Sequence, residues 1–399
     1  MTDVVIVDAV RTPIGRYKGA LKSIRPDDLG ALVIEALIER NPSVPLKQIE
    51  EVVFGNANGA GEDNRNVARM SALLAGLPVE VAGTTINRLC GSGLDAVNYA
   101  ARAILAGEGD IFIAGGTESM TRAPFVMGKP DAAFPRGNQQ LLDTTIGWRF
   151  VNDKLKEMYG ADSMPETAEN VAVKYSISRE KQDQFAFESQ QKAATAIKNQ
   201  AFKNEIIPVH YFDQKGNEVI VQQDEHPRPS SSQQKLANLK PLFKGGTVTA
   251  GNASGINDGA SALLLMSKKK AQELGIKPLV QYVTSATAGL EPRVMGLGPV
   301  FATKKAIERA SLSTQDLDLI ELNEAFASQS LACIQELDLH VEKVNVNGGA
   351  IAFGHPLGAS GARILTSLIH EMQKRESTYG LATMCVGVGQ GIATIVKKL

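Results

Sequence analysis

Cysteine is scarce in this chain of 399 residues, which contains Cys90, Cys333 and Cys385 and no others. Three scattered cysteines exclude a disulfide framework and a paired Cys-x-x-Cys metal site, and they favour a reducing compartment. The five histidines also lack the spacing of metal ligands, so no metal site is expected. Long apolar runs are missing too: none is long enough to cross a membrane, and the N-terminal run at residues 4–7 ends at Asp8. We therefore expect neither a signal peptide nor a membrane span.

The chain also lacks an excess of either charge. It has 42 Lys and Arg against 43 Asp and Glu, so electrostatics give no reason to expect nucleic acid or an acidic membrane as a partner. No Gly-x-Gly-x-x-Gly follows an expected strand and there is no Walker loop, which argues against dinucleotide and nucleoside triphosphate sites. The terminal Lys397-Lys398-Leu399 differs by one residue from the Ser-Lys-Leu peroxisomal signal, and the cytoplasm is the expected location.

The sequence contains one structural plan twice. In the first half, the pattern predicts strands at 4–8, 49–54, 83–87 and 110–114 and helices at 27–40, 66–74 and 94–106. The second half repeats this order, with strands at 280–284, 317–322 and 381–384 and helices at 299–310 and 362–374. Such alternation predicts a parallel sheet with helices on both faces. Residues 119–255, polar and with one long helix at 179–198, are interpreted as an insertion over one end of the first half, placed to hold an extended ligand.

Cys90 lies in Asn87-Arg88-Leu89-Cys90-Gly91-Ser92-Gly93, immediately before an expected helix. The free N–H groups and the dipole of a helix start favour thiolate, and the glycines leave room for a substrate. This pattern is typical of a nucleophile. A buried structural cysteine and an ordinary strand-to-helix turn are alternatives that this stretch leaves open.

His355 is surrounded by glycines, and Ser360-Gly361 after it corresponds to Ser92-Gly93 after Cys90. The repeat therefore places His355 and Cys90 on equivalent loops, which favours a catalytic histidine over the commoner structural one. Because active groups collect at the carboxyl ends of parallel strands, we expect Cys90, His355, Asn323 and Cys385 to lie together.

Cys385 ends a strand beside glycines whose N–H groups can converge on an oxyanion. Two cysteines without a metal pattern suggest that one takes up an acyl group while the other moves a proton at carbon. A redox pair is an alternative, but it leaves His355 without a role. Asn323 is suited to hold a water or a carbonyl oxygen, or to cap a helix. Cys333 lies mid-helix among apolar residues and is assigned to the core.

Six stretches together resemble the thiolase family, in its order and over essentially the whole chain: residues 87–93, 115–120, 251–255, 323–326, 354–356 and 385–387. The combination differs from the related ketoacyl synthases, which use one cysteine with two histidines or with a histidine and an asparagine. The resemblance implies an α/β fold of five layers, α/β/α/β/α, duplicated and with an inserted loop domain. It assigns residues 1–118 to the first half, which is completed by about 256–278. Residues 119–255 are assigned to a loop domain binding coenzyme A, and residues 279–399 to the second half. A homotetramer of tight dimers is also implied.

The resemblance implies an acyltransferase that cleaves a 3-oxoacyl-CoA with coenzyme A, and runs the reverse Claisen condensation, through an acyl-cysteine. Cys90 would be the nucleophile and His355 its base. Cys385 would move the proton at the α-carbon, and Asn323 would hold a water that stabilises the enolate. The N–H groups of Cys90 and Gly387 would bind the oxyanion.

The same resemblance places coenzyme A, a substrate and not a tightly bound cofactor, against the loop domain. Ser254 would lie beside the pantetheine and Arg228 at the nucleotide side. Met164, Ala325 and Phe326 would form the apolar lining.

Residues 61–66, 143–150 and 162–167 look closer to the 3-oxoadipyl-CoA thiolases, and Ser163 stands where the biosynthetic acetoacetyl-CoA enzymes carry a histidine. A dicarboxylic substrate calls for a cation near its tail; Arg149 is a candidate, and a structural or surface arginine is the alternative. An acetoacetyl-CoA or general 3-ketoacyl-CoA thiolase, and a non-catalytic acyl-CoA-binding protein of the same fold, are the other hypotheses.

Overall fold

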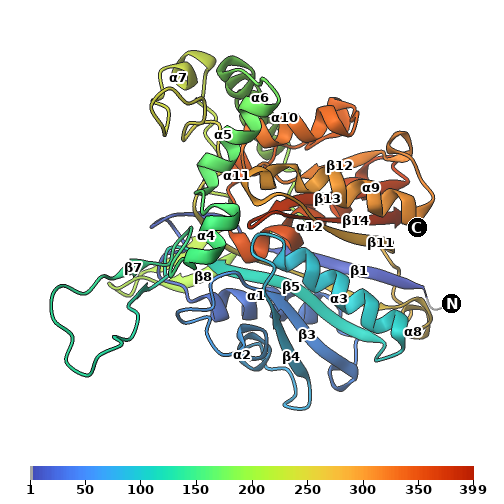
Figure 1. The fold of residues 1–399 in the computed structure, drawn as a ribbon. Coiled ribbons are helices and arrows are strands. Elements are labelled where there is room, and N and C mark those ends of the chain that lie inside the picture. Colours follow the sequence, from blue (N-terminus) through green and yellow to red (C-terminus); the bar gives the residue numbers. More distant parts are fainter. Residues whose placement is uncertain (1–2) are drawn as a thin grey trace.

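The computed structural model describes residues 3–399 and contains a ten-stranded sheet made of two halves (Figure 1). The halves join where β1 (Val4–Arg11) pairs with β11 (Val280–Gly289). Outward from β1, the first half-sheet continues through β10 (Asn257–Ser267), β5 (Ile111–Ser119), β3 (Ile49–Gly55) and β4 (Ala82–Ile86), and the short β2 (Gly15–Arg16) pairs with β10. Outward from β11, the second continues through β14 (Gln390–Lys398), β13 (Tyr379–Val386) and β12 (Leu319–Leu322).

The second half-sheet repeats the first strand by strand. The order β11, β14, β13, β12 corresponds to β1, β10, β5, β3. In the first half, β4 lies in parallel beside β3. At the equivalent place in the second half, Val344 forms a parallel bridge to Ile320 of β12. The internal repeat predicted from the sequence is confirmed.

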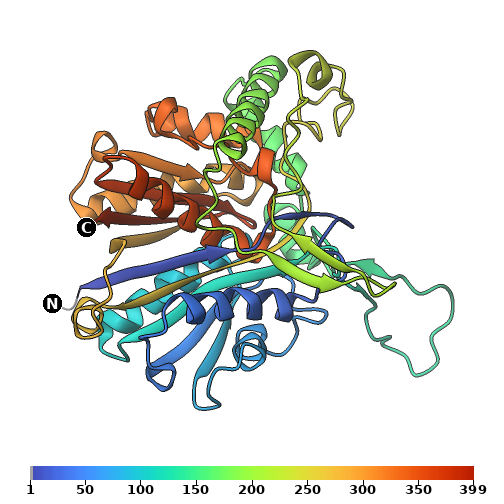
Figure 2. The same cartoon turned by 180° about the vertical axis from the view of Figure 1, so that it is seen from behind.

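Helices form three layers around the two half-sheets (Figures 1 and 2). Between them lie α3 (Ser92–Ala106) and α12 (Leu357–Lys374). The outer face of the first half is covered by α1 (Pro26–Arg40) and α2 (Val67–Leu74), with α8 (Lys268–Glu273) near its edge. The outer face of the second half is covered by α9 (Gly298–Ala310) and α10 (Ala327–Glu336). The five-layered α/β/α/β/α arrangement is therefore confirmed.

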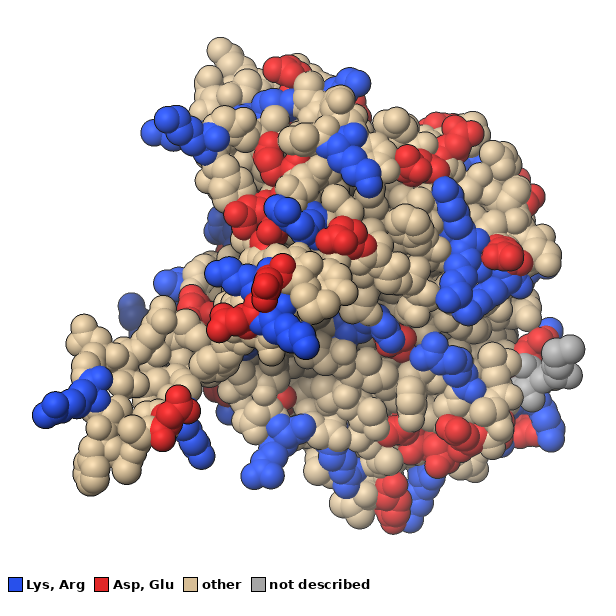
Figure 3. All heavy atoms as spheres, viewed as in Figure 1, with Lys and Arg blue, Asp and Glu red and all other residues tan. Residues whose placement is uncertain are grey.

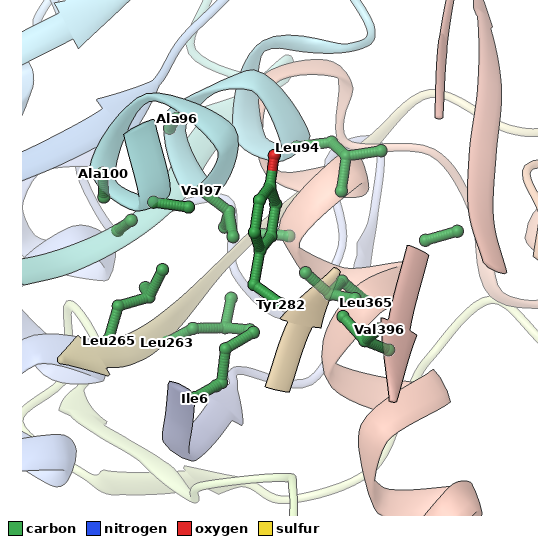
Figure 4. Close-up of a cluster of buried hydrophobic side chains, with 14 of the residues drawn as sticks. Ile6, Leu94, Ala96, Val97, Ala100, Leu263, Leu265, Tyr282, Leu365 and Val396 are labelled. Atoms are coloured by element: carbon green, nitrogen blue, oxygen red, sulfur yellow. The ribbon is translucent and has the colours of Figure 1, made fainter. Parts of the chain in front are cut away.

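The middle layer contains a large apolar core (Figure 4). Leu94 and Val97 of α3 pack with Leu365 of α12 and with side chains from both half-sheets, including Leu263 of the first and Val396 of the second. Burial of such side chains contributes about 1.5–3 kcal/mol each relative to exposure. The core therefore holds α3 and α12 firmly, and any group at their N-terminal ends has a rigid support.

The N-terminal ends of α3 and α12 touch backbone to backbone. A Cβ atom on Gly93 would lie 2.6 Å from the Gly358 carbonyl oxygen, and one on Gly361 would lie 2.4 Å from the Leu94 nitrogen. Only glycine permits so close an approach. Gly93 and Gly361 occupy equivalent places in the two halves, so the duplication brings the loop before α3 against the loop before α12.

The prediction of a parallel sheet is wrong. The pairs β3–β4, β3–β5 and β12–β13 are parallel, but β1–β10, β10–β5, β11–β14 and β13–β14 are antiparallel. No strand was predicted at β10 or β14, the returning strands. A tight turn joins β13 to β14, and such a turn allows only an antiparallel pair.

Two helix starts also differ from the prediction. α12 begins at Leu357 and not at Ala362, and α3 begins at Ser92 and not at Leu94. Both Ser-Gly pairs therefore lie within the first five residues of their helices. The small residues that suggested loops serve the close contact between the two helices.

The inserted segment lies across the ends of both halves, whereas we expected it over the first half alone. Its helices are α4 (Asp153–Tyr159), α5 (Met164–Lys174), α6 (Arg179–Lys198) and α7 (Gln233–Ala237). α5 and α6 pack against α10, and α6 also packs against α11 (Ala350–Phe353), so these helices cover part of the second half. The hairpin of β8 (Val209–Phe212) and β9 (Glu218–Val221) packs against the first half through the buried Val209.

A long loop between β6 (Phe125–Val126) and β7 (Leu142–Asp143) projects from the body in both views. Acidic and basic side chains are intermingled over the face shown in Figure 3. No helix within residues 3–399 has the length and apolarity needed to cross a lipid bilayer.

Candidate active site

A cavity of about 470 Å³ lies between the inserted segment and the N-terminal ends of α3 and α12. Eight of the ten site residues predicted from the sequence line it, namely Cys90, Met164, Arg228, Ser254, Ala325, Phe326, His355 and Cys385. The other two, Asn323 and Gly387, do not line this cavity. Asn323 directly precedes the loop that carries Ala325 and Phe326, and Gly387 lines a neighbouring cavity together with Cys90.

Strained backbone flanks the cysteine. Leu89, just before Cys90, has a φ of 46°, and Val388, on the loop that approaches it from β13, has a φ of 61°. Left-handed conformations of this kind cost about 1–3 kcal/mol in non-glycine residues and cluster at functional sites. The turn is held by Ser92, whose Oγ accepts a hydrogen bond from the Arg88 N–H at 2.9 Å and donates one to the Leu89 carbonyl at 2.6 Å. This network fixes the direction of the Cys90 side chain.

The thiol of Cys90 is harder to ionise than the sequence pattern suggested. Burial raises its pKa to about 11, although the backbone N–H groups of Gly387 and of Cys90 itself stabilise the thiolate. The negative charge of Glu118 raises the pKa further. The backbone N–H groups at the helix start favour the thiolate, as predicted, but desolvation outweighs them and the net pKa is raised. At neutral pH the group is a thiol, and a base must remove its proton.

His355 is positioned through its backbone and through one ring nitrogen. Its N–H donates to Asn257 Oδ1 at 2.9 Å. A Cβ atom on the preceding Gly354, which has a φ of 98°, would lie 2.3 Å from Asn257 Cγ, so that position requires glycine. The Nδ1 atom lies 2.6 Å from Ser360 Oγ. Because the single proton of Ser360 is donated to the Pro356 carbonyl at 2.9 Å, Ser360 Oγ accepts from Nδ1–H.

This tautomer leaves the His355 Nε2 atom with a free lone pair. Nε2 is buried and has no hydrogen-bond partner in the described chain. Burial lowers the pKa of His355 to about 3, and the charge of Arg363 acts in the same direction. The imidazole is therefore neutral at physiological pH, and its free nitrogen belongs to a residue that lines the cavity with Cys90 and Cys385. The free Nε2 lone pair is the position on this ring that can accept a proton.

Cys385 and Asn323 complete the group at the ends of neighbouring strands. Cys385 is buried near the carboxyl end of β13, and burial followed by the proximity of Cys90 raises its thiol pKa. Asn323 follows β12, and its N–H donates to the Thr383 carbonyl of β13 at 3.0 Å. Both side-chain amide atoms of Asn323 are buried without a hydrogen-bond partner among residues 3–399. A buried amide of this kind is suited to bind a water or substrate oxygen.

A second cavity, of about 260 Å³, meets the first at Cys90. Cys90, Met164 and Leu357 line both, and Arg149 and Gly387 line only the second. The thiol therefore has room on two sides. A substrate bound through one cavity can extend past the sulfur into the other.

Sequence reasoning missed several residues that shape the site. Ser360 was noted as part of a repeat and not as the partner of His355, and Asn257 lies in the unrecognised β10. Glu118 lies in a stretch that carried the family resemblance but was given no role. His226 lines the first cavity, and burial with the charges of Arg228 and Arg16 lowers its pKa to about 4. No local pattern marks His226, because its neighbours come from distant segments. Cys333 is fully buried, as predicted.

Comparisons with known proteins agree with this geometry. The family models for the thiolase N-terminal and C-terminal domains match residues 4–269 and 276–398. The chain is 56% identical to the beta-ketoadipyl-CoA thiolase of Acinetobacter baylyi, with 100% of both chains covered. It is 51% identical to the acetyl-CoA acetyltransferase of Chromobacterium violaceum, with 99% of this chain and 100% of that one covered. The crystal structure of the Bacillus anthracis acetyl-CoA acetyltransferase matches with a TM-score of 0.94 and 41% identity, covering 100% of this chain and 99% of the other. The chain belongs to the thiolase family.

Proposed function

We propose that this thiolase cleaves 3-oxoadipyl-CoA with coenzyme A to give succinyl-CoA and acetyl-CoA, and that it catalyses the reverse condensation. The observation that carries the reaction is the convergence of Cys90, His355 and Cys385 on one cavity. The substrate is supported by the 56% identity, over the whole chain, to a relative named for beta-ketoadipyl-CoA. A relative named acetyl-CoA acetyltransferase is less similar, at 51%.

The first half-reaction breaks a carbon–carbon bond. His355 Nε2 takes the proton of Cys90, and the thiolate attacks the C3 ketone carbon of the substrate. The C2–C3 bond then breaks, its electron pair stays on C2 as the enolate of acetyl-CoA, and Cys385 gives that carbon a proton. The succinyl group remains on Cys90. We assign Asn323 to hold the water that stabilises the enolate oxygen, because its amide is buried and unpartnered within residues 3–399.

The second half-reaction transfers the acyl group to coenzyme A. His355 returns its proton to the Cys385 thiolate and then takes the proton of the incoming CoA thiol, whose sulfur attacks the acyl carbonyl. The oxyanion accepts hydrogen bonds from the N–H groups of Cys90 and Gly387, which already face the sulfur. Collapse releases the Cys90 thiolate, and this takes the proton back from His355. All three side chains then regain their starting states.

Coenzyme A is proposed to lie in the larger cavity, against the segment we assign as a loop domain at residues 119–255. Ser254 is held at the cavity wall by its N–H, which donates to the Ala325 carbonyl at 2.9 Å. Met164 and Phe326 supply apolar surface for the pantetheine, and Arg228 supplies a cation for the nucleotide phosphates. This direction brings the CoA sulfur toward Cys90.

Steady-state kinetics with the unmodified protein test the substrate. We expect kcat/KM for 3-oxoadipyl-CoA to exceed that for acetoacetyl-CoA by about 10-fold or more, because a pocket that fits the larger acyl chain gives additional transition-state binding. Thiolysis is followed by loss of the 3-oxoacyl-CoA and by chromatography of the products. A preference for acetoacetyl-CoA, or equal use of many chain lengths, contradicts the substrate assignment and supports the acetoacetyl-CoA or general 3-ketoacyl-CoA alternative.

We also propose a homotetramer built as a dimer of dimers. β4 ends the first half-sheet and is partly exposed, so its outer edge can pair with a second copy. The loop between β6 and β7 projects from the body, and Phe134 on it is 93% exposed. We expect light scattering after size-exclusion chromatography to give four times the mass of one chain, and a shortened loop to give dimers. A monomeric wild-type protein would contradict this assembly.

The cytoplasm remains the proposed location. Cys90, Cys333 and Cys385 are all free thiols. Unpaired cysteines persist in reducing compartments, and the proposed reaction requires two of them in reduced form.

A further inference from the structure

Arg149 is a cation in the second cavity without an acidic partner. No carboxylate of the described residues lies within 4.0 Å of its guanidinium, and Nη1 donates to the neutral Asn58 Oδ1 at 3.1 Å. Other arginines nearby are paired, as Arg122 is with Glu62 and Arg88 with Asp95. An arginine turned into a cavity with only a neutral partner retains free donors for an anion.

The surroundings of Arg149 strengthen its attraction for an anion. The cavity wall is largely apolar, with Trp148, Ile146 and Val388 among its lining residues. An apolar wall lowers the local dielectric, so a charge pair formed there is stronger than in water. Trp148 is held in place by its Nε1–H, which donates to the Asp162 carbonyl at 3.2 Å. Asn58 is held as well, because its Nδ2 donates to the Thr144 carbonyl at 3.0 Å.

Glu118 is the acidic side chain that lines the same cavity, and its charge is engaged elsewhere. Oε2 accepts the backbone N–H groups of Ala57 and Gly358, each at 2.8 Å, and Oε1 accepts the N–H of Asn58 at 3.3 Å. These donors come from both halves of the chain, and the carboxyl that they hold forms no ion pair within 4.0 Å with Arg149. Glu118 therefore does not neutralise the guanidinium.

The second cavity offers the acyl group a direction in which to extend beyond Cys90. In the proposed function coenzyme A occupies the larger cavity, and the carbon attacked by Cys90 is the C3 carbonyl. The chain beyond C3 continues away from coenzyme A, and the second cavity is the space that meets the first at Cys90. The far end of the acyl chain is thus directed toward the cavity that contains Arg149.

We propose that Arg149 binds the terminal carboxylate of the acyl group held on Cys90, so that the second cavity selects dicarboxylic over monocarboxylic 3-oxoacyl-CoA substrates. This inference rests on the proposed function and names the residue that sets its substrate class. The planar guanidinium suits a carboxylate because two parallel N–H groups can meet its two oxygens. A substrate that ends in a methyl group leaves the guanidinium desolvated and without an anionic partner, so the same residue disfavours it.

The test compares two substrates of equal length that differ only at the terminus: 3-oxoadipyl-CoA, which ends in a carboxylate, and 3-oxohexanoyl-CoA, which ends in a methyl group. The readout is the ratio of their kcat/KM values. We expect Arg149→Met to lower this ratio on the order of 20-fold, at the lower end for a hydrogen bond to a charged group because Arg149 is half-buried. Arg149→Lys keeps the positive charge but not the two parallel N–H groups, and its ratio should lie between those of the wild type and Arg149→Met. Lys154→Met, which removes an exposed cation from α4 in the same segment, is the matched control and should keep the wild-type ratio.

The outcomes separate this inference from the proposed function. A wild-type enzyme that prefers 3-oxoadipyl-CoA, combined with an unchanged ratio in Arg149→Met, overturns the role of Arg149 and leaves the substrate standing. A wild-type enzyme that prefers 3-oxohexanoyl-CoA overturns both. Because a ratio cancels losses common to the two substrates, a variant that merely destabilises the loop does not imitate the expected result.

Discussion

Replacing Cys90 by alanine is expected to lower kcat by about 10⁴-fold or more and to abolish acylation, because none of the other described residues that line both cavities carries a nucleophile. In the wild-type protein, acetyl-CoA without a second substrate should release one equivalent of free coenzyme A and leave an acetyl label on Cys90. Mass spectrometry of the intact chain and of the peptide that contains Cys90 measures both. In Cys90→Ser the label should be lost as well, since the hydroxyl is a far weaker nucleophile than a thiol.

Cys333→Ala is the control for this experiment. Cys333 is fully buried in α10, and its Sγ lies 3.3 Å from the Gly296 carbonyl, so the change removes a cysteine without touching the cavity. Acylation should then match the wild type. If the label appears on a residue other than Cys90, or if no label forms, the nucleophile is misassigned. Complete absence of acylation and turnover in the wild type would favour the non-catalytic acyl-CoA-binding protein.

Replacing Cys385 by alanine is expected to separate the two half-reactions. Acylation of Cys90 uses His355 as the base and should persist, whereas exchange of the α-protons of acetyl-CoA with deuterated solvent should fall by about 10³-fold or more, and turnover with it. Burial raises the pKa of Cys385 well above its usual value, so this thiol remains protonated until the enolate or His355 exchanges a proton with it. Mass spectrometry of acetyl-CoA follows the exchange, and Cys90 labelling follows acylation in the same sample.

The pair of measurements makes this result specific. A folding defect lowers both acylation and exchange, whereas loss of the proton-transfer group lowers exchange alone. Cys385→Ser keeps the shape of the side chain but has a much less acidic proton, and its exchange should also be slow. Retained exchange in Cys385→Ala refutes the proposed proton transfer and would point to His355 as the group that moves the α-proton.

The sequence was sufficient for those parts of the protein that depend on local pattern and on order along the chain. The repeat, the bounds of α6, the insertion between two similar halves and the candidates Cys90, His355 and Cys385 followed from spacing, glycine density and residue type, and the family resemblance supplied the roles proposed for them. These features are readable because a strand end, a helix start and a glycine-rich loop each depend on neighbouring residues. The equivalence of Cys90 and His355 was readable for the same reason, since duplication copies a local pattern.

The tertiary structure decided the properties that depend on neighbours from distant segments. The helix start suggested an easily ionised Cys90, but burial by residues from both halves and the inserted segment raises its pKa to about 11. The basic nitrogen of His355 depends on Ser360 and Pro356, and the free guanidinium of Arg149 on the engagement of Glu118 by both halves. Desolvation and hydrogen-bond partners act through space and not along the chain. Residue types therefore identified the chemistry, while only their packing determined which group holds a proton and that two cavities meet at Cys90.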